Sequence, residues 1–393
     1  MLIIIFIPFL QSSYSSFFLQ LHRLVPTIIE TLRNIDLRKI SSMGTSTVGV
    51  DDLGCVYMWG AGGSAGGNMN VHNLVNSTYG YGLHDHRKIV HPQLVTSIPS
   101  KERVIDVSCG LGHVLFLLEN GWVRSSGSGG NGRLGLGDTY DRKEPCLIES
   151  LLGENIVSVQ CGASHSSALS QSGLVYGWGK NTQGQCGNGH LCEVLVPTLN
   201  KTLSAIEVIT QIAAGWEHSI ALSANGGLYA WGCGYKDNRR GIVPPVLGLK
   251  DNDGRTIPEK LTNFPDFFCD VFKFSGSGSM GLFKIDVEPY KIVSIVSGWD
   301  HCLALDNKGR VRSWGSGQNG KLGTGNEESV SVPTVVNALC AVHVISISAG
   351  CEHSAAVTDD GVVYTWGHGD GEIMLFLWYT GESSTLRMLF SQK

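Results

Sequence analysis

Short runs in which apolar and polar residues alternate recur along the chain and predict β-strands. Residues 156–160 alternate in this way, which is typical of a half-buried strand. Residues 165–170 and 174–178 read as second and third strands, separated by a hairpin turn at 171–173 in which Gly173 supplies the positive φ that short hairpins need. Residues 196–199 contain Pro197 and predict a short outer strand, because proline suits a sheet edge. The pattern therefore predicts a unit of three or four antiparallel strands.

The same unit recurs in a fixed frame. Each copy has a histidine with one glycine three residues before it and two further glycines eight and fourteen residues after it. In most copies a tryptophan stands directly before the last of these glycines. The histidines are His113, His165, His218, His301 and His353, at steps of 52, 53, 83 and 52 residues, and the tryptophans are Trp178, Trp231, Trp314 and Trp366. An upstream stretch, STVGVDDLGCVYMWG, reads as a degenerate sixth copy with Ser46 in place of the histidine. A period of about fifty residues predicts an all-β fold, a β-propeller of about six visible repeat units, in preference to a solenoid.

The pattern CGxxHSxAL…GxVYxWGxNxxGQxG resembles the repeat of the regulator of chromosome condensation family, and the segment CGASHSSALSQSGLVYGWGKNTQGQCGNG carries it most completely. The resemblance spans roughly residues 44–371. It implies a propeller that usually has seven blades, whereas six units are visible here, so closure of the ring stays open. We expect an N-terminal segment over 1–43, the propeller over 44–371 and a divergent C-terminal tail over 372–393.

Composition and charge narrow the choice of partners. Glycine contributes 51 of 393 residues, and the net charge of −5 with a pI near 6.2 gives little attraction to nucleic acid or anionic membrane. The eleven cysteines do not show zinc spacing, and Cys109 and Cys161 share a repeat position that suits a buried thiol. Free thiols favour a cytoplasmic or nuclear protein.

The N-terminus supports the alternative of a secretory protein. Residues 1–21 carry no charge and can be read as a signal peptide or membrane anchor, as a mispredicted extension, or as the start of a short packing helix across 17–34. Contact with a membrane is expected only if this segment is an anchor. Two N-glycosylation sequons begin at Asn76 and Asn200.

Several motifs that suggest chemistry are better explained by the repeat. Residues 315–321 fit the start of a phosphate-binding loop, but Leu322 stands where Ser or Thr is needed, and similar glycine-rich turns recur in other units. The phased histidines are expected to be neutral, hydrogen-bonded to backbone beside the glycine turn and spread around a ring, and the tryptophans to pack between blades. We therefore predict no catalytic residue, no cofactor and no metal site, and hence no enzyme of covalent chemistry.

Recognition is expected where the repeats differ, because loops on a rigid scaffold carry binding. One insertion, about 61–91, contains His72, His84, His86 and His91. These histidines are either a chance enrichment in a loop or the ligands of a metal site. The second lies between Gly232 and Lys291 and includes the apolar VPPVLGL and the segment FPDFFCDVFKF at 264–274, for which core filling is an equal alternative. Within it, the predicted partner-binding patch comprises Tyr235, Lys236, Asp237, Arg239 and Arg240.

The family resemblance implies three functions. Its founding member is a guanine-nucleotide exchange factor for a small nuclear GTPase. It releases the bound nucleotide by binding the nucleotide-free GTPase more tightly. Other members are propellers of HECT-type ubiquitin ligases or free-standing adaptors. We expect a protein-interaction propeller with exchange-factor activity as one option and an adaptor as another. A secreted or membrane-anchored ligand-binding propeller is the alternative from a different class.

Overall fold

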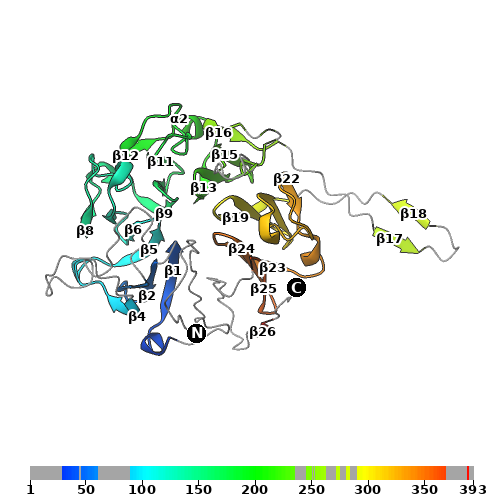
Figure 1. The fold of residues 1–393 in the computed structure, drawn as a ribbon, viewed down its shortest axis with the longest axis horizontal. Helices are drawn as coiled ribbons and strands as arrows, with labels where there is room; N and C mark the ends of the chain where they lie inside the picture. Colours follow the sequence, from blue (N-terminus) through cyan, green and yellow to red (C-terminus); the bar gives the residue numbers. More distant parts are fainter. Residues whose placement is uncertain are drawn as a thin grey trace, which may run out of the picture.

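The computed structural model describes residues 29–43, 46–60, 89–234, 245–249, 251, 253–262, 271–274, 280–283, 290–368 and 387–388. Within them, six four-stranded sheets follow one another around a common centre, as Figure 1 shows. The predicted all-β propeller with six repeat units is thereby confirmed. In these same residues no helix combines the length and apolar character needed to cross a membrane.

Each blade is built from four strands that run in order from the centre of the ring to its rim. Blade 1 contains β1 (Leu37–Met43), β2 (Ser46–Asp51), β3 (Val56–Gly60) and β4 (Ile89–Leu94). Blade 2 contains β5 (Val104–Cys109), β6 (His113–Leu118), β7 (Val123–Gly127) and β8 (Arg142–Leu147). Blade 3 contains β9 (Ile156–Cys161), β10 (His165–Ser170), β11 (Val175–Gly179) and β12 (Val194–Leu199).

The remaining blades repeat this order. Blade 4 contains β13 (Ile209–Ala214), β14 (His218–Ser223), β15 (Leu228–Gly232) and β16 (Arg255–Lys260). Blade 5 contains β19 (Ile292–Ser297), β20 (His301–Asp306), β21 (Val311–Gly315) and β22 (Val330–Val335). Blade 6 contains β23 (Val344–Ala349), β24 (His353–Thr358), β25 (Val362–Gly367) and β26 (Arg387–Met388). A separate hairpin of β17 (Val271–Phe274) and β18 (Met280–Phe283) stands apart from the blades in Figure 1.

Short helical segments and turns complete the blades. Residues that link an outer strand to the next inner strand form η3 (Glu149–Leu151), α2 (Lys201–Ser204) and η5 (Asn337–Leu339), and η1 (Glu30–Leu32) precedes β1. Glycine-rich turns after the third strand form η2 (Gly130–Gly132) and η4 (Gln318–Gly320). Their central residues Asn131 and Asn319 have φ near 60°, so these are kinked turns.

Apolar residues of neighbouring blades form the core. The second strands are buried along their whole length, because each lies between two other strands of its own sheet and is covered on both faces by the adjacent sheets. One buried cluster joins Val48 and Met58 of blade 1 to Phe116 of blade 2, and similar clusters join each later pair of consecutive blades. Among the described buried residues, no apolar cluster joins blade 6 to blade 1.

The ends of the array differ from the expected boundaries. β1 pairs antiparallel with β2, so the propeller takes in residues 37–43, which precede the repeat signature and were expected to belong to the N-terminal segment. At the other end, the tail contributes β26, which pairs with β25 in parallel, whereas β4, β8, β12, β16 and β22 are antiparallel outer strands. Residues 1–28 lie outside the described part of the chain.

Candidate partner-binding face

Two kinds of connection emerge on the same face of the propeller. The first residue of each second strand pairs with the last residue of the third strand, as His165 does with Gly179. The turn before the histidine and the loop after the glycine must therefore lie side by side. We call this side the loop face; it comprises the turns 110–113, 162–165, 215–218, 298–301 and 350–353 with the loops that follow the third strands.

The phased histidines link neighbouring blades beneath the loop face. Nε2 of His165 lies 2.9 Å from Oγ of Ser219 in the next blade. His113 and His301 make the same contact with Ser166 and Ser354, at 2.9 and 2.8 Å. His218 instead contacts Oγ of Ser297 at 2.6 Å, with Sγ of Cys302 at 3.3 Å. The sequence predicted a backbone partner for these rings; the structure places a side chain of the following blade there.

Burial keeps these imidazoles neutral. Desolvation lowers the pKa of His165 and of His218 from 6.5 to about 3, with nearby positive charge as a smaller cause. The pKa of His113 and that of His301 are also lowered well below 6.5, mainly by burial. The imidazoles of the successive blades are spread around the propeller and do not come together at one point. Within the described residues there is no group of three or more His, Cys, Asp or Glu that could hold a metal ion.

The glycine three residues before each histidine is required by the imidazole. A Cβ on Gly162 would lie 2.1 Å from Cε1 of His165 and 2.6 Å from the carbonyl oxygen of Gly215 in the next blade. Both approaches are far inside van der Waals contact. Any larger residue would push the ring away from its serine and separate the two turns.

A second contact between blades is made by each phased tryptophan. Nε1 of Trp178 donates to the carbonyl oxygen of Arg133 in the preceding blade at 3.0 Å, and Oγ of Ser166 donates to the same oxygen at 2.8 Å. Trp231, Trp314 and Trp366 donate to the carbonyl oxygens of Gln185, Val246 and Lys321. Because the serine hydroxyl already donates to the carbonyl, it accepts from Nε2–H of the histidine.

Acidic side chains of the turns pair with lysines of the loops. Nζ of Lys321 is fully buried and lies 2.5 Å from Asp300 and 2.7 Å from Glu352 of the next blade. Lys180, which directly follows Gly179, pairs with Glu217 across blades 3 and 4 at 2.5 Å. Burial raises the pKa of Asp300, and Lys321 opposes that rise. The resemblance of 315–321 to a phosphate-binding loop is thus accounted for, since Lys321 neutralises carboxylates and no helix follows.

Two tryptophans of the turns stack on one another across the boundary of blades 4 and 5. The rings of Trp216 and Trp299 have centroids 3.9 Å apart and planes inclined by 14°. Both side chains are half-buried. The backbone N–H of Trp216 donates to the carbonyl of Trp299 at 3.0 Å, which holds the two turns together. In the other blades the corresponding positions are Leu111, Ala163 and Cys351, so the aromatic pair is confined to this sector. Sequence reasoning did not single out this pair; the recurrence of a tryptophan two residues before the histidine in adjacent units was the available signal.

The predicted patch of Tyr235, Lys236, Asp237, Arg239 and Arg240 lies outside the described residues. Its anchors are described: Gly234 follows β15, and Val246 lies where the repeat places Arg133 and Gln185. Arg133 lies six positions after Gly127, whereas Val246 lies fourteen positions after Gly232, so the loop of blade 4 is eight residues longer. Gly234, the last described residue before the patch, lies on the loop face because it follows the end of β15.

The second insertion proves to be two insertions on opposite faces. Its apolar segment VPPVLGL contributes Val246, Leu247 and Leu249 to the core between blades 4 and 5 and is therefore structural. β16 follows and completes blade 4. The extra residues between β16 and β19, which include the hairpin of β17 and β18, belong to the connection on the face opposite the loop face. The side chains of 264–274, and the histidines His72, His84, His86 and His91, lie beyond what the structure describes.

Two further sequence features acquire structural roles. Asn200 is 1 % exposed; its side chain accepts from the backbone N–H of Leu203 at 3.1 Å and donates to the carbonyl of Gly187 at 2.9 Å. This sequon residue is therefore a helix cap and cannot carry a glycan in the folded protein. Cys109 and Cys161 are buried, and their thiols donate to the carbonyls of Ser41 and Ser108 at 3.3 and 3.2 Å. Burial raises the pKa of Cys109 to about 12, so it is not a nucleophile.

Comparison with known proteins identifies the repeat. Profiles of the regulator of chromosome condensation (RCC1) repeat match residues 120–169, 172–222 and 308–357, and a second profile of that repeat matches 156–185, 209–241 and 292–321. The chain therefore contains RCC1 repeats. It is 31% identical over 298 residues to the ultraviolet-B receptor UVR8 of Arabidopsis thaliana, covering 74% of this chain and 60% of UVR8.

Other RCC1 repeat proteins show how widely the propeller is used. The chain is 30% identical over 285 residues to the human E3 ubiquitin-protein ligase HERC2, covering 71% of this chain but 5% of HERC2. Among solved structures, Prp20p of Saccharomyces cerevisiae, described with its binding properties to Gsp1p and histones, superposes with a TM-score of 0.61 at 24% identity, covering 84% of this chain and 71% of Prp20p. The chain thus spans less than two thirds of UVR8 and a small part of HERC2, and the likeness to Prp20p shows the fold.

Proposed function

We propose that this RCC1 repeat protein is a protein-interaction propeller that binds a partner on its loop face, and that guanine-nucleotide exchange on a small GTPase is its activity. The stacked pair of Trp216 and Trp299 carries this proposal. Large aromatic side chains supply much of the binding energy at protein interfaces when a partner covers them. The binding properties of Prp20p to Gsp1p and histones support a protein ligand for this fold.

The surroundings of the tryptophan pair favour a partner with basic side chains. Glu217 and Asp300 directly follow Trp216 and Trp299, and Glu352 lies in the next turn. Lys180 and Lys321 neutralise part of this charge. The sequence-predicted patch at 235–240 follows Gly234 directly in the chain and is included in the proposed surface as a prediction.

Exchange would operate through coupled binding. A propeller that binds the nucleotide-free GTPase more tightly than the loaded form weakens nucleotide affinity by the same factor, because the two binding events are thermodynamically reciprocal. No bond is made or broken by the propeller, so the surface needs shape and charge rather than a nucleophile.

The test is release of a fluorescent guanine nucleotide from a panel of purified small GTPases. We expect the full chain to accelerate release from at least one of them, and Trp216→Ala with Trp299→Ala to abolish the acceleration. Trp122→Ala is the matched control, because Trp122 is 39% exposed in a hairpin on the opposite face. Absence of acceleration across the panel would reject exchange activity, and equal loss in the Trp122 variant would reject the loop face.

A loop deletion tests the patch at 235–240. Removal of residues 236–243 shortens the loop of blade 4 to the length found in blade 2 while keeping Val246, whereas removal of all of 233–290 would also delete β16 and the anchor of Trp314. We expect the short deletion to weaken partner capture in a pull-down. Removal of 271–283 from the opposite face is the control and should leave capture unchanged.

The adaptor function found in a ubiquitin ligase such as HERC2 is the second candidate. It predicts a stable complex in pull-downs without any effect on nucleotide release. We place the protein in the cytoplasm or nucleus, because the buried Cys109, Cys161 and Cys186 are free thiols. A secreted protein would instead carry a glycan at Asn76, which peptide mapping of protein from a eukaryotic host would detect.

A further inference from the structure

Acidic residues of the turns are confined to the sector of the loop face that carries the stacked tryptophans. In blades 4, 5 and 6 the residue directly before the phased histidine is acidic, whereas in blades 2 and 3 it is uncharged. The acids are Glu217, Asp300 and Glu352, and the uncharged residues are Gly112 and Ser164. The charge therefore accompanies the aromatic pair and is not a general feature of the repeat.

A lysine of blade 3 reaches the first of these acids. Lys180 directly follows Gly179, the last residue of β11. In blades 2, 4, 5 and 6 the residues at the same position are Ser128, Cys233, Ser316 and His368. Nζ of Lys180 lies 2.5 Å from Oε1 of Glu217 in blade 4. Among these five blades the lysine thus occurs only in the one directly before Trp216.

Both ends of this ion pair start from a fixed backbone. The N–H of Lys180 donates to the carbonyl of Ser164 in its own blade at 2.9 Å. The N–H of Cys233 donates to the carbonyl of Glu217 at the same distance. The side chain of Glu217 is 10% exposed and that of Lys180 is 31% exposed, so the carboxylate is buried and the ammonium group reaches solvent. The pair therefore ties the turn of blade 4 to the loop of blade 3.

The acid that follows the second tryptophan is bound on the other side of the pair. Asp300 directly follows Trp299, and its carboxylate lies 2.5 Å from Nζ of Lys321. The same Nζ lies 2.7 Å from Glu352 of blade 6. Asp300 is therefore held towards the boundary of blades 5 and 6, whereas Glu217 is held towards blade 3.

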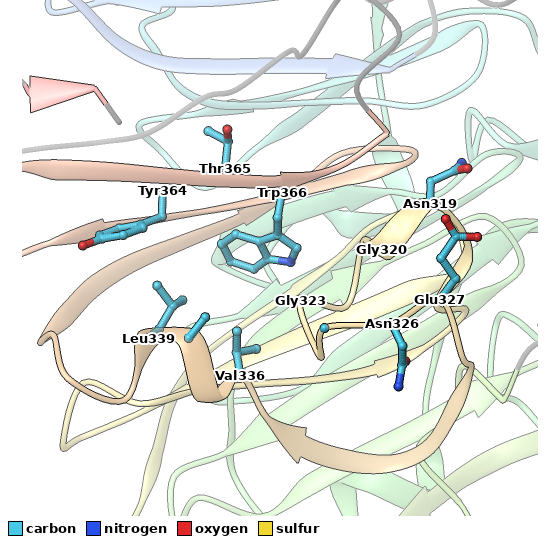
Figure 2. A pocket seen from close by; sticks show the side chains of 12 residues that line it. Asn319, Gly320, Gly323, Asn326, Glu327, Val336, Leu339, Tyr364, Thr365 and Trp366 are labelled. Atoms are coloured by element: carbon cyan, nitrogen blue, oxygen red, sulfur yellow. The ribbon is translucent and has the colours of Figure 1, made fainter. Parts of the chain in front are cut away.

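The loop that carries Lys321 is itself attached to blade 6. The carbonyl oxygen of Lys321 accepts from Nε1 of Trp366 at 2.9 Å and from Oγ of Ser354 at 2.8 Å. Figure 2 shows the indole of Trp366 facing the part of this loop that contains Gly320 and Gly323. A Cβ on Gly323 would lie 2.9 Å from Nε1 of that indole, so loop and ring are in close contact. The position of Lys321 is thus set by blade 6 and does not depend on the stacked pair.

The two indoles meet between these oppositely held acids. Trp216 and Trp299, each one residue before its acid, stack across the boundary of blades 4 and 5 with centroids 3.9 Å apart. The hydrogen bond from the N–H of Trp216 to the carbonyl of Trp299 joins the two turns. One hydrogen bond does not fix the rotation of either turn about it, and each ion pair supplies a second attachment on the far side. The stack therefore depends on both lysines.

We propose that Lys180 is a positioning residue, which acts through Glu217 to hold the turn of blade 4 in the orientation that stacks Trp216 on Trp299. This role rests on the proposed function, in which the stacked pair contacts the partner. Without the ammonium group, the buried carboxylate of Glu217 has lost its counter-ion and turns towards solvent, because an unpaired charge is unfavourable away from water. The turn follows the carboxylate, and the two indoles separate while Lys321 keeps the second turn in place.

Circular dichroism of the full chain measures the stacking without a partner. Two stacked indoles couple their electronic transitions and give a couplet, and Trp299→Ala defines the spectrum without it. We expect Lys180→Met to lose more than half of the couplet and Lys180→Arg, which keeps the cation, to retain it. Lys260→Met is the control, because Lys260 pairs with Glu207 on the opposite face and its loss should leave the couplet unchanged. Equal couplets in Lys180→Met and the wild type would overturn the proposal.

A second variant keeps the test decisive if Lys180→Met is poorly folded. Glu217→Gln preserves the shape of the side chain and removes the ion pair from the other end, while Lys180 can extend into water. We expect this variant to lose the couplet as well, with a melting temperature close to that of the wild type. A couplet of wild-type amplitude in Glu217→Gln would overturn the positioning role, whatever the stability of Lys180→Met.

Nucleotide release separates this role from the proposed function. On a GTPase that the wild-type chain unloads, we expect Lys180→Met to reduce the acceleration several-fold and Lys260→Met to retain it. Full acceleration by Lys180→Met despite a lost couplet would overturn the link between stacking and partner binding. A panel on which the wild type has no effect rejects exchange activity, whereas the couplet still decides whether Lys180 positions the rings.

Discussion

Nε2 of His165 lies 2.9 Å from the hydroxyl oxygen of Ser219, which belongs to the next blade of the propeller. The hydroxyl in turn donates to the carbonyl of Gln185, which also accepts from the indole of Trp231. The histidine, the serine and the tryptophan of the repeat thus meet at the boundary between blades 3 and 4. Their fixed spacing in the sequence follows from this contact between successive units.

Removal of the serine hydroxyl should weaken this boundary. Ser219→Ala leaves Nε2–H of a buried imidazole without its acceptor, so we expect the free energy of unfolding to fall by about 1–3 kcal/mol. Urea denaturation measures the change. Ser204→Ala, at an exposed position in α2, is the control and should stay within about 0.5 kcal/mol of the wild type. Similar values for both variants would contradict the role given to Ser219.

Stability should depend on pH through the buried histidines. The pKa of His165 and of His218 is about 3 in the folded protein, against 6.5 when exposed, so below pH 6.5 the unfolded chain binds more protons. Their stabilising contribution is complete above pH 6.5 and is lost as the pH falls toward 3, by about 2 kcal/mol for each histidine at pH 5. Urea denaturation between pH 7.5 and pH 5 should show this loss, and His165→Gln should make the slope shallower. An unchanged slope in that variant would contradict the assignment.

A glycine in the loop of blade 4 should be sensitive to substitution. Gly248 has φ of +72°, and a Cβ there would lie 2.7 Å from Leu261 and 3.0 Å from Nε1 of Trp314. We expect Gly248→Ala to cost about 1–3 kcal/mol beyond the cost of the left-handed backbone alone. Gly153→Ala is matched, because Gly153 has φ of +88° and open space around it. Thermal melts of the two variants should differ by several degrees, and coincident melts would show that crowding at Gly248 is absent.

The buried lysine between two acids should be required for folding stability. Lys321→Met leaves the largely buried Asp300 without its cation, and loss of one partner of a buried pair costs about 3–5 kcal/mol. Lys260 pairs with Glu207 at the surface, so Lys260→Met is the control and should cost less than about 1 kcal/mol. Chemical denaturation distinguishes the two. A small effect of Lys321→Met would indicate that Asp300 takes up a proton in the variant. The loss of unfolding free energy would then appear only at higher pH, where Asp300 ionises.

Much of the architecture was accessible from periodicity, and the exceptions have physical causes. The strands of blade 3 follow directly from alternation and turn residues, and Pro197 marked the outer strand. The boundary expected at residue 44 left out β1, because its sequence LRKISSM does not alternate as residues 156–160 do. The serine partner of the histidines was missed because it lies one whole repeat away, beside the next histidine.

The candidate surface was only partly predictable. The residues at 235–240 were chosen because they depart from the repeat, but nothing in their sequence indicates that the same insertion also contains Val246, which anchors Trp314. The stacking of Trp216 on Trp299 could not be deduced either, since the two residues are 83 positions apart and meet only when two turns are brought side by side.

The amino-acid sequence alone determined the repeat, the strand content and the radial fold, because each is set by local alternation, turn glycines and a period that every unit shares. The tertiary structure decided which residues meet across blade boundaries, which half of an insertion belongs to the core, and which described outer strand pairs in parallel. These properties arise between units, where the spacing of one blade from the next, rather than the pattern within a blade, determines which side chains and backbone groups come within hydrogen-bonding distance.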